Sequence, residues 1–200
     1  VLAFVAWSDR SNAESDESSS GDGAAVASGP SRLDDAMRVL DPADVPRFAQ
    51  LGVIAAMQGV HATSDGPWIP KRLGEERALK TSYVFRDLMN TGAIISNGTD
   101  VPVEDINPIA SFYSSVSLRT NENKVFNDKQ RMTREEALRA YTLNGAFAAF
   151  EEKEKGSLAP GKLADIVVLS QDIMTIPEEQ IPTTQVDLTI VGGKVRHRRQ

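Results

Sequence analysis

The chain has 200 residues, a formal net charge of −6 and no cysteine, and these bulk properties exclude several classes of protein. Its hydrophobic and charged fractions, 40% and 25%, are ordinary for a globular protein of one or two domains. The acidic balance argues against a nucleic-acid partner, because phosphate contacts require a basic surface. Without cysteine, disulfides and zinc–thiolate sites are excluded. No apolar run reaches the roughly 18 residues of a membrane span, so we expect no membrane partner and a cytoplasmic location.

Residues 1–31 contain little that could build a core. Residues 1–7 are apolar, but the run is short and has no basic lead-in, which makes it a poor signal peptide. Residues 8–31 are rich in Ser, Gly, Asp and Glu, a composition that cannot offset the entropy cost of ordering. We therefore predict that 1–31 is a disordered or non-homologous segment. Because the chain begins with Val1 rather than Met, either it was processed or it belongs to something longer.

From residue 32 the pattern changes to alternating helices and strands. Asp41 as N-cap and Pro42 at the first helical position predict a short helix that Gly52 ends. Residues 53–58 form a short apolar run between glycines, which is typical of a fully buried strand in a parallel sheet.

A second helix and strand follow after a loop at 61–70. The spacing of apolar residues predicts a helix over 75–90, which Gly92 stops, and then a second buried strand over 93–96. The order helix, strand, loop, helix, strand predicts the β/α alternation of a parallel α/β fold.

One more helix ends the α/β region, and a small β unit follows it. A capping box from Thr133 to Glu136 starts this helix, which we expect to end near Phe150. The strands predicted for the β unit are 166–169, 186–191 and, after a Gly192-Gly193 hairpin turn, 194–195. The basic cluster at 196–199 is expected to be a solvated end.

Three segments of the chain together resemble the amidohydrolase superfamily, most closely amidohydrolase family 3. These segments are 51–65, 92–103, and 138–144 with 156–169. Members of that family are (β/α)8 TIM barrels with a small β-sandwich built from both chain ends. The resemblance covers roughly residues 32–195.

The resemblance implies an α/β fold that is only part of such a barrel. Residues 32–155 would hold the last two or so β/α units, with 53–58 as the seventh strand and 93–96 as the eighth. Residues 156–200 would form the C-terminal part of the β-sandwich.

The same resemblance implies a chemistry. Family members hydrolyse amide-like C–N bonds of small molecules, usually with one or two divalent metals, and zinc is the metal expected. A carboxylate at the end of the last strand moves the proton of the attacking water. Asp100 matches that position, just past an apolar strand, where barrel active sites lie. The alternative interpretation is that 98–100 is a turn, with Asp100 capping the next segment.

Three residues after the preceding strand are candidate substrate contacts. His61 resembles a family histidine that lies in the pocket near the substrate, although a lone histidine is more often structural. Asp65 and Trp68 are weaker candidates in the same loop.

The metal-binding histidines of the family have no counterpart here. The family's sixth-strand histidine falls on Asp35, and no strand pattern precedes it, so we do not expect Asp35 to bind metal. His197 is the only histidine besides His61. Asp100 would bind a metal only if the missing ligands are supplied elsewhere, because zinc usually has three protein ligands. We predict that this chain alone binds no catalytic metal and turns over nothing.

Two hypotheses of function follow. The first is a hydrolase of small amide-like molecules that is active only with a missing N-terminal half. The second is a non-catalytic remnant that acts as an interaction or scaffold protein, and the open strand edges of a partial barrel also allow self-association. A self-standing hydrolase of another type is disfavoured, because no Gly-x-Ser-x-Gly segment is present.

Overall fold

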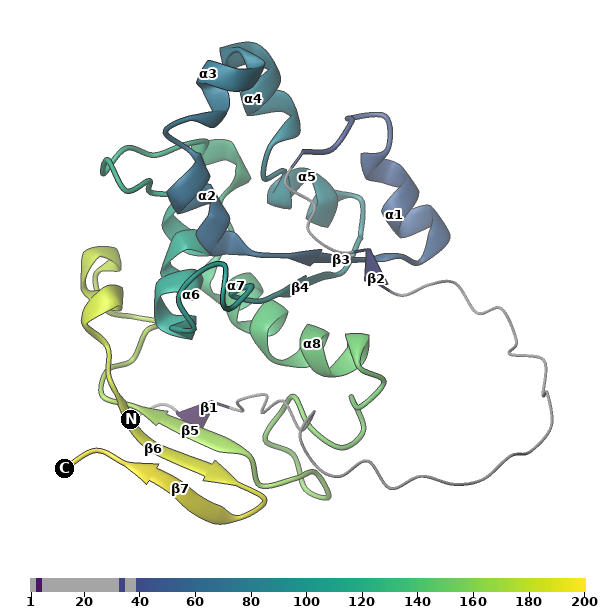
Figure 1. Ribbon diagram of the computed structural model, residues 1–200. Helices are drawn as coiled ribbons and strands as arrows, with labels where there is room; N and C mark the ends of the chain where they lie inside the picture. Colours follow the sequence, from purple (N-terminus) through teal and green to yellow (C-terminus); the bar gives the residue numbers. More distant parts are fainter. Residues whose placement is uncertain (1–2, 5–32, 35–38) are drawn as a thin grey trace, which may run out of the picture.

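Two sheets of different character organise the chain (Figure 1). The computed structural model describes residues 3–4, 33–34 and 39–200. The parallel sheet has the order β2 (Leu33–Asp34), β3 (Ile54–Met57), β4 (Ile95–Asn97). The antiparallel sheet has the order β1 (Ala3–Phe4), β5 (Ile166–Leu169), β6 (Val186–Val191), β7 (Lys194–Arg198). The fold is therefore mixed α/β.

The parallel sheet is the centre of the larger part of the molecule. Its register pairs Ala55 with Ile95 and Met57 with Asn97, which places the carboxyl ends of β3 and β4 side by side. The helices around it are α1 (Val45–Leu51), α2 (Gly59–Asp65), α3 (Ile69–Leu73), α4 (Glu75–Thr81), α5 (Phe85–Asn90), α6 (Pro108–Ser117), α7 (Arg134–Tyr141) and α8 (Leu143–Ala148). The predicted strands at 53–58 and 93–96 are thus confirmed: the first is shorter by one residue at each end, and the second begins two residues later and ends one residue later.

The predicted helix over 75–90 is wrong in one respect, because it is two helices. The chain breaks between α4 and α5 at Tyr83, whose φ is +53°. The buried Tyr83 hydroxyl donates to Asp65 over 2.5 Å, so a contact distant in sequence fixes this break. The helix predicted from Thr133 is also divided, at Thr142, although its capping box is present as predicted.

Two further local expectations are corrected. The first helix begins at Val45 with Asp44 as N-cap, not at Asp41. Asp41 instead closes a turn, since its Oδ1 accepts from the backbone N–H of Ala43 at 2.9 Å. The predicted loop at 61–70 contains α2 and the start of α3.

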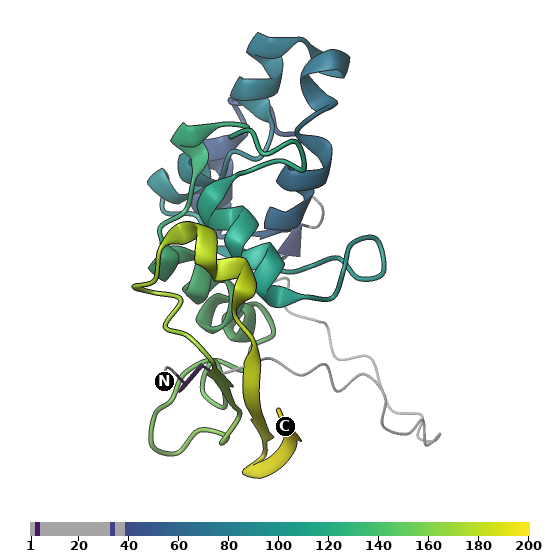
Figure 2. The same cartoon turned by 90° about the vertical axis from the view of Figure 1, so that its left-hand side faces the viewer.

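The antiparallel sheet lies beside the α/β part, and the connection between β5 and β6 packs against that part (Figure 2). This connection contains the short 3-10 helix η2 (Glu178–Thr183), and Ile181 in it is fully buried in the same core as Phe85 and Leu88. Arg131, in the α/β part, pairs with Glu178 at 2.6 Å. The predicted strands 166–169 and 186–191 and the Gly192-Gly193 hairpin are confirmed.

Strands β1 and β2 were not foreseen. Ala3–Phe4 falls within the segment predicted to be disordered, yet it pairs with β5 in antiparallel fashion. Leu33–Asp34 pairs in parallel with β3, so a strand does precede Asp35, contrary to expectation. Asp35 itself and residues 5–32 lie outside the described part of the chain.

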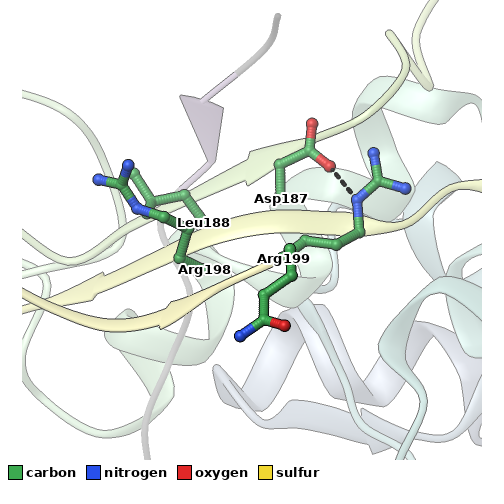
Figure 3. Close-up of a pocket in the computed structure, with 5 residues that line it drawn as sticks. Asp187, Leu188, Arg198 and Arg199 are labelled. Atoms are coloured by element: carbon green, nitrogen blue, oxygen red, sulfur yellow. Dashed lines mark ion pairs between the residues drawn. The ribbon is translucent and has the colours of Figure 1, made fainter.

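The basic residues 196–198 belong to β7, which is exposed along its whole length, and Arg199 follows it. Arg199 pairs with Asp187 of β6 at 2.7 Å, so this end is attached to the sheet. An open surface hollow of about 460 Å³ lies here, lined by Asp187, Leu188, Arg198, Arg199 and Gln200. Figure 3 shows the Arg199–Asp187 ion pair at this hollow. No helix within the described ranges is both long and apolar enough to cross a membrane.

Candidate active site

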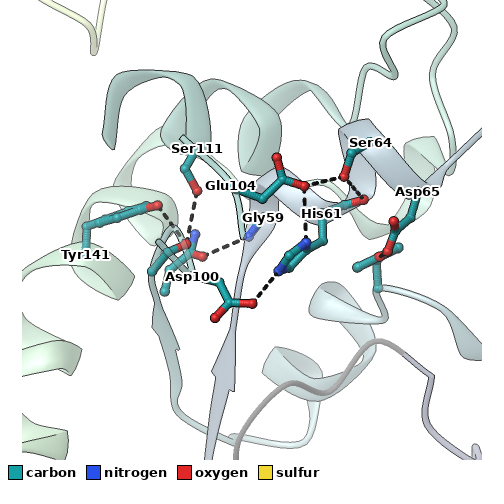
Figure 4. A network of polar contacts seen from close by, with 11 residues as sticks. Gly59, His61, Ser64, Asp65, Asp100, Glu104, Ser111 and Tyr141 are labelled. Atoms are coloured by element: carbon teal, nitrogen blue, oxygen red, sulfur yellow. Dashed lines mark hydrogen bonds and ion pairs between the residues drawn. The ribbon is translucent and has the colours of Figure 1, made fainter. Parts of the chain in front are cut away.

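Two predicted site residues meet at the carboxyl ends of the parallel strands. His61 follows β3 on the first turns of α2, and Asp100 follows β4 by three residues. The His61 Nε2 atom lies 3.1 Å from Asp100 Oδ2 (Figure 4). The His61 side chain is 2% exposed, whereas that of Asp100 is 36% exposed. One side of the pair is therefore buried in the protein, and the carboxylate remains accessible to a small molecule.

A second carboxylate continues this row on the other side of the imidazole ring. The Glu104 Oε1 atom lies 3.3 Å from His61 Nδ1. The same oxygen accepts a hydrogen bond from the Ser64 hydroxyl at 2.5 Å. Both ring nitrogens of His61 thus face carboxylate oxygens, which fixes the plane of the ring and aims Nε2 at Asp100.

The backbone around Asp100 has an unusual conformation. Its φ is +59°, in the left-handed region that non-glycine residues seldom adopt. The Asp100 carbonyl accepts from the N–H groups of Val103 at 2.7 Å and Glu104 at 3.3 Å. A turn therefore starts at Asp100 and covers residues 101–103, after the 98–100 segment that the alternative interpretation expected to form the turn, and the Asp100 side chain contacts His61.

The other two candidate substrate residues make contacts of their own. Asp65 is 7% exposed, and one of its oxygens accepts from the buried Tyr83 hydroxyl, a contact that explains its burial structurally. Trp68 is 43% exposed, and its ring packs under the Arg72 guanidinium at 5.6 Å. Their contact with a substrate stays a prediction.

The described residues do not by themselves fit a catalytic metal ion. Among these residues, no group of three or more His, Asp or Glu side chains is arranged so that it could hold a metal ion. Asp100 and Glu104 lie on opposite nitrogens of His61, so the three side chains form a row and do not converge on one point. Zinc in catalytic sites usually has three protein ligands. Within the described chain, Asp100 remains a single candidate ligand.

Several polar residues of the site were missed by sequence reasoning. Glu104 and Ser64 have a local signal, because each lies three or four residues from a predicted site residue. Asn97 and Tyr141 have none, since their partners are about forty residues away in sequence. Nothing short of the fold itself brings them to the site.

Comparison with known proteins places the chain in a family. A model of the amidohydrolase family, in its family 3 branch, matches residues 22–197. The protein LONG AFTER FAR-RED 3 of Arabidopsis thaliana is 38% identical over 78% of this chain and 27% of its own length. The N-substituted formamide deformylase of Arthrobacter pascens is 28% identical over 76% of this chain and 28% of its own length.

A solved structure agrees with these relatives. The metal-dependent hydrolase of Pyrococcus horikoshii superposes with a TM-score of 0.63 and 28% identity, covering 72% of this chain and 29% of that one. This chain thus spans less than a third of the length of each of these proteins. The family match over most of the chain, the parallel strands and the aspartate at their carboxyl ends agree, and the chain belongs to amidohydrolase family 3.

Proposed function

We propose that this chain supplies the C-terminal part of an active site that hydrolyses a non-peptide C–N bond of a small, amide-like molecule. The observation that carries the proposal is the contact between Asp100 and the buried His61 at the carboxyl ends of two neighbouring parallel strands. Active sites of parallel β/α barrels lie at that end of their strands. The name of the relative that deformylates N-substituted formamides supports the same bond class.

In this proposal β3 and β4 are the last two strands of a (β/α)8 barrel, and the sheet of β5, β6 and β7 is the C-terminal part of a β-sandwich. The parallel register of β3 and β4, with helices between them, supports the first assignment. The antiparallel order β1-β5-β6-β7 supports the second, since it combines strands from both ends of the chain.

Asp100 is the proposed general base and acid. Its carboxylate accepts a proton from the attacking water as the oxygen adds to the carbonyl carbon, and returns a proton to the nitrogen as the C–N bond breaks. His61 holds the carboxylate in place by its contact with Oδ2, and the half-exposed Asp100 side chain faces the space where the water would approach. A divalent metal, where the family uses one, would need ligands besides Asp100 that the described residues do not provide.

A second candidate function, a non-catalytic interaction protein, is favoured by one observation. Three aliphatic side chains follow Asp100 in the loop before α6 and are largely exposed: Val101 at 53%, Val103 at 65% and Ile106 at 70%. Exposed apolar side chains gathered on one loop are typical of surfaces that contact another polypeptide. Such a surface agrees equally with docking of the rest of a barrel, so experiment must separate the two functions.

The test extends the coding sequence upstream of Val1 and compares the longer product with this chain. Amine release from N-substituted formamides and cyclic amides is the measurement. We expect hydrolysis by the longer product and a loss of about 10²- to 10⁴-fold in Asp100→Asn, the range of a general acid–base group. Asp105→Asn is the matched control in the same loop, because the new amide keeps the oxygen that accepts from Asn107. Hydrolysis that survives Asp100→Asn refutes the proposed role of Asp100. A longer product that hydrolyses none of these substrates refutes the proposed hydrolase and favours the second candidate function, a non-catalytic interaction protein.

A further inference from the structure

A hydrogen-bonded network beneath the His61–Asp100 pair connects the two segments that carry it. His61 lies on α2 and Asp100 lies beyond β4, so strand pairing alone does not fix the distance between their side chains. Pairing ends with Met57 opposite Asn97. Interactions beyond the Met57–Asn97 pair must therefore set the distance of 3.1 Å between His61 Nε2 and Asp100 Oδ2.

Asn97 provides the first connection. It ends β4 and is 9% exposed. Its Oδ1 accepts from the backbone N–H of Gly59, the first residue of α2, at 2.9 Å. Its Nδ2 donates to the Ser115 hydroxyl of α6 at 2.7 Å. One amide side chain thus holds the start of the helix that carries His61 against the end of the strand that leads to Asp100.

The carbonyl of Gly98 provides the second connection. It accepts from the Ser111 hydroxyl of α6 at 3.2 Å and from the Tyr141 hydroxyl of α7 at 3.1 Å. The Gly98 N–H donates to Met57 of β3 at 3.0 Å. Gly98, two residues before Asp100, is therefore held by three hydrogen bonds, two to its carbonyl and one from its N–H (Figure 4 labels Ser111 and Tyr141).

These contacts at Gly98 restrain the backbone just before Asp100, whose own φ is positive. Residues with positive φ other than glycine are strained, and they persist only where the surrounding contacts determine the backbone. Burial raises the pKa of the Tyr141 phenol far above neutral, so its hydroxyl remains a donor throughout the physiological range. The donors to Gly98 stay in place whatever the pH of the surroundings within that range.

We propose that Asn97 and Tyr141 are positioning residues that set the geometry of the His61–Asp100 pair, the first through the start of α2 and the second through the carbonyl of Gly98. This inference rests on the proposed function for its significance, because it assigns these residues to the same site. Neither side chain touches the reacting atoms, and each acts through the backbone that carries a site residue.

The experiment reads the His61 ring directly. The chain has two histidines, so ¹⁵N labelling of histidine gives resolved ring signals for His61 and for His197, which is exposed on β7 and serves as the internal reference. The full chain is compared at one pH with Tyr141→Phe and with Asn97→Ala. Tyr113→Phe, which also removes one hydroxyl from a half-buried tyrosine, is the matched control.

We expect the His61 nitrogen signals to shift in Tyr141→Phe and further in Asn97→Ala, with His197 unchanged and with Tyr113→Phe like the parent. Unchanged His61 signals in both folded variants overturn the proposal, as does an equal shift in Tyr113→Phe. Should either variant lose its circular dichroism spectrum, Ser111→Ala removes the other donor to Gly98 and is read in the same way. The measurement needs no turnover, so shifted His61 signals in this chain, together with no hydrolysis by the upstream-extended product, would refute the proposed function alone.

Discussion

The α/β part and the antiparallel sheet differ in what they bury. Strands β3 and β4 are mostly buried, and β4 ends in Asn97, whose polar side chain is buried and hydrogen-bonded. Strand β6 is half-buried at every residue, and β7 is exposed at every residue. Buried polar groups need specific partners, since an unpaired one costs the full desolvation penalty. The part that contains such groups is therefore the part that can hold a catalytic pair in one geometry.

This difference also explains which structural features follow from local sequence and which do not. The hairpin β6–β7 requires only a tight turn between two strand-forming segments, which local sequence supplies. The site requires that α2, α6 and α7 converge on the ends of β3 and β4, which only the packed core achieves. The following predictions test whether the two parts differ in this way.

The largest effect is expected from the core of the α/β part. Phe85 is fully buried, and Phe85→Ala should lower the free energy of unfolding by about 3–5 kcal/mol through lost burial and the cavity left behind. Val195→Ala on β7, where the side chain is 52% exposed, should change it by about 0.5 kcal/mol or less. Urea denaturation followed by circular dichroism measures both. An equal cost for the two variants would show that the hairpin belongs to the same tightly packed core.

The second effect tests the close approach of α2 to α6. A Cβ atom added to Gly59 would lie 2.0 Å from the Ser115 hydroxyl and 3.2 Å from the Ser111 carbonyl. Gly59→Ala should therefore destabilise the protein by about 1–3 kcal/mol, as overpacking does. Gly145 in α8 is the control, because its added Cβ meets nothing closer than 3.9 Å.

For Gly145→Ala we expect a gain of about 0.5–1 kcal/mol, since alanine in a helix loses less backbone entropy than glycine. The urea midpoints of the two variants should thus move in opposite directions. A Gly59→Ala protein as stable as the parent would show that α2 and α6 separate easily, and it would weaken the case for a fixed His61–Asp100 geometry.

Much of the fold follows from local sequence. The capping box at Thr133, the hairpin at Gly192 and the two buried strands of the parallel sheet are each determined by neighbouring residues. The break at Tyr83 could not be predicted, because the apolar periodicity of 75–90 continues through it while a hydrogen bond to Asp65 interrupts it.

The site divides in the same way. Asp100 and His61 follow apolar strands, so their meeting could be predicted from the parallel order of those strands. Asn97 and Tyr141 could not be assigned, because their partners, Gly59 and Gly98, lie on other elements. A turn residue such as Gly98 predicts a loop, but it does not indicate which side chains donate hydrogen bonds to that loop.

The third effect concerns acid stability of the α/β part. The hydrogen bond from Arg86 lowers the pKa of Glu136 from 4.5 to about 2, and the contacts with Thr133 act in the same direction. A carboxylate whose pKa is lower in the folded than in the unfolded chain stabilises the fold at any pH above its unfolded pKa. This contribution is lost as the pH falls from about 4.5 to about 2. With partial exposure screening the pair, we expect a loss of about 1–2 kcal/mol over this range.

Glu136→Gln should remove this part of the acid dependence. The control is Glu76→Gln on α4, where the pair with Lys80 is exposed on both sides. Unfolding free energies between pH 2 and pH 7 should therefore flatten for Glu136→Gln and stay parallel to the parent for Glu76→Gln. Parallel curves for both variants would contradict a stabilising role of the Arg86–Glu136 contact.

The smallest effect is expected for metal binding, and it tests whether the α/β part is a complete site. Both nitrogens of His61 already face carboxylates, and Asp100 is a single candidate ligand, so a zinc ion would find fewer protein ligands among the described residues than a catalytic site usually offers. Equilibrium dialysis of this chain against zinc should retain no stoichiometric, tightly bound ion. Retention of one ion per chain that disappears in Asp100→Ala, and not in Asp105→Asn, would show instead that this chain completes its own metal site.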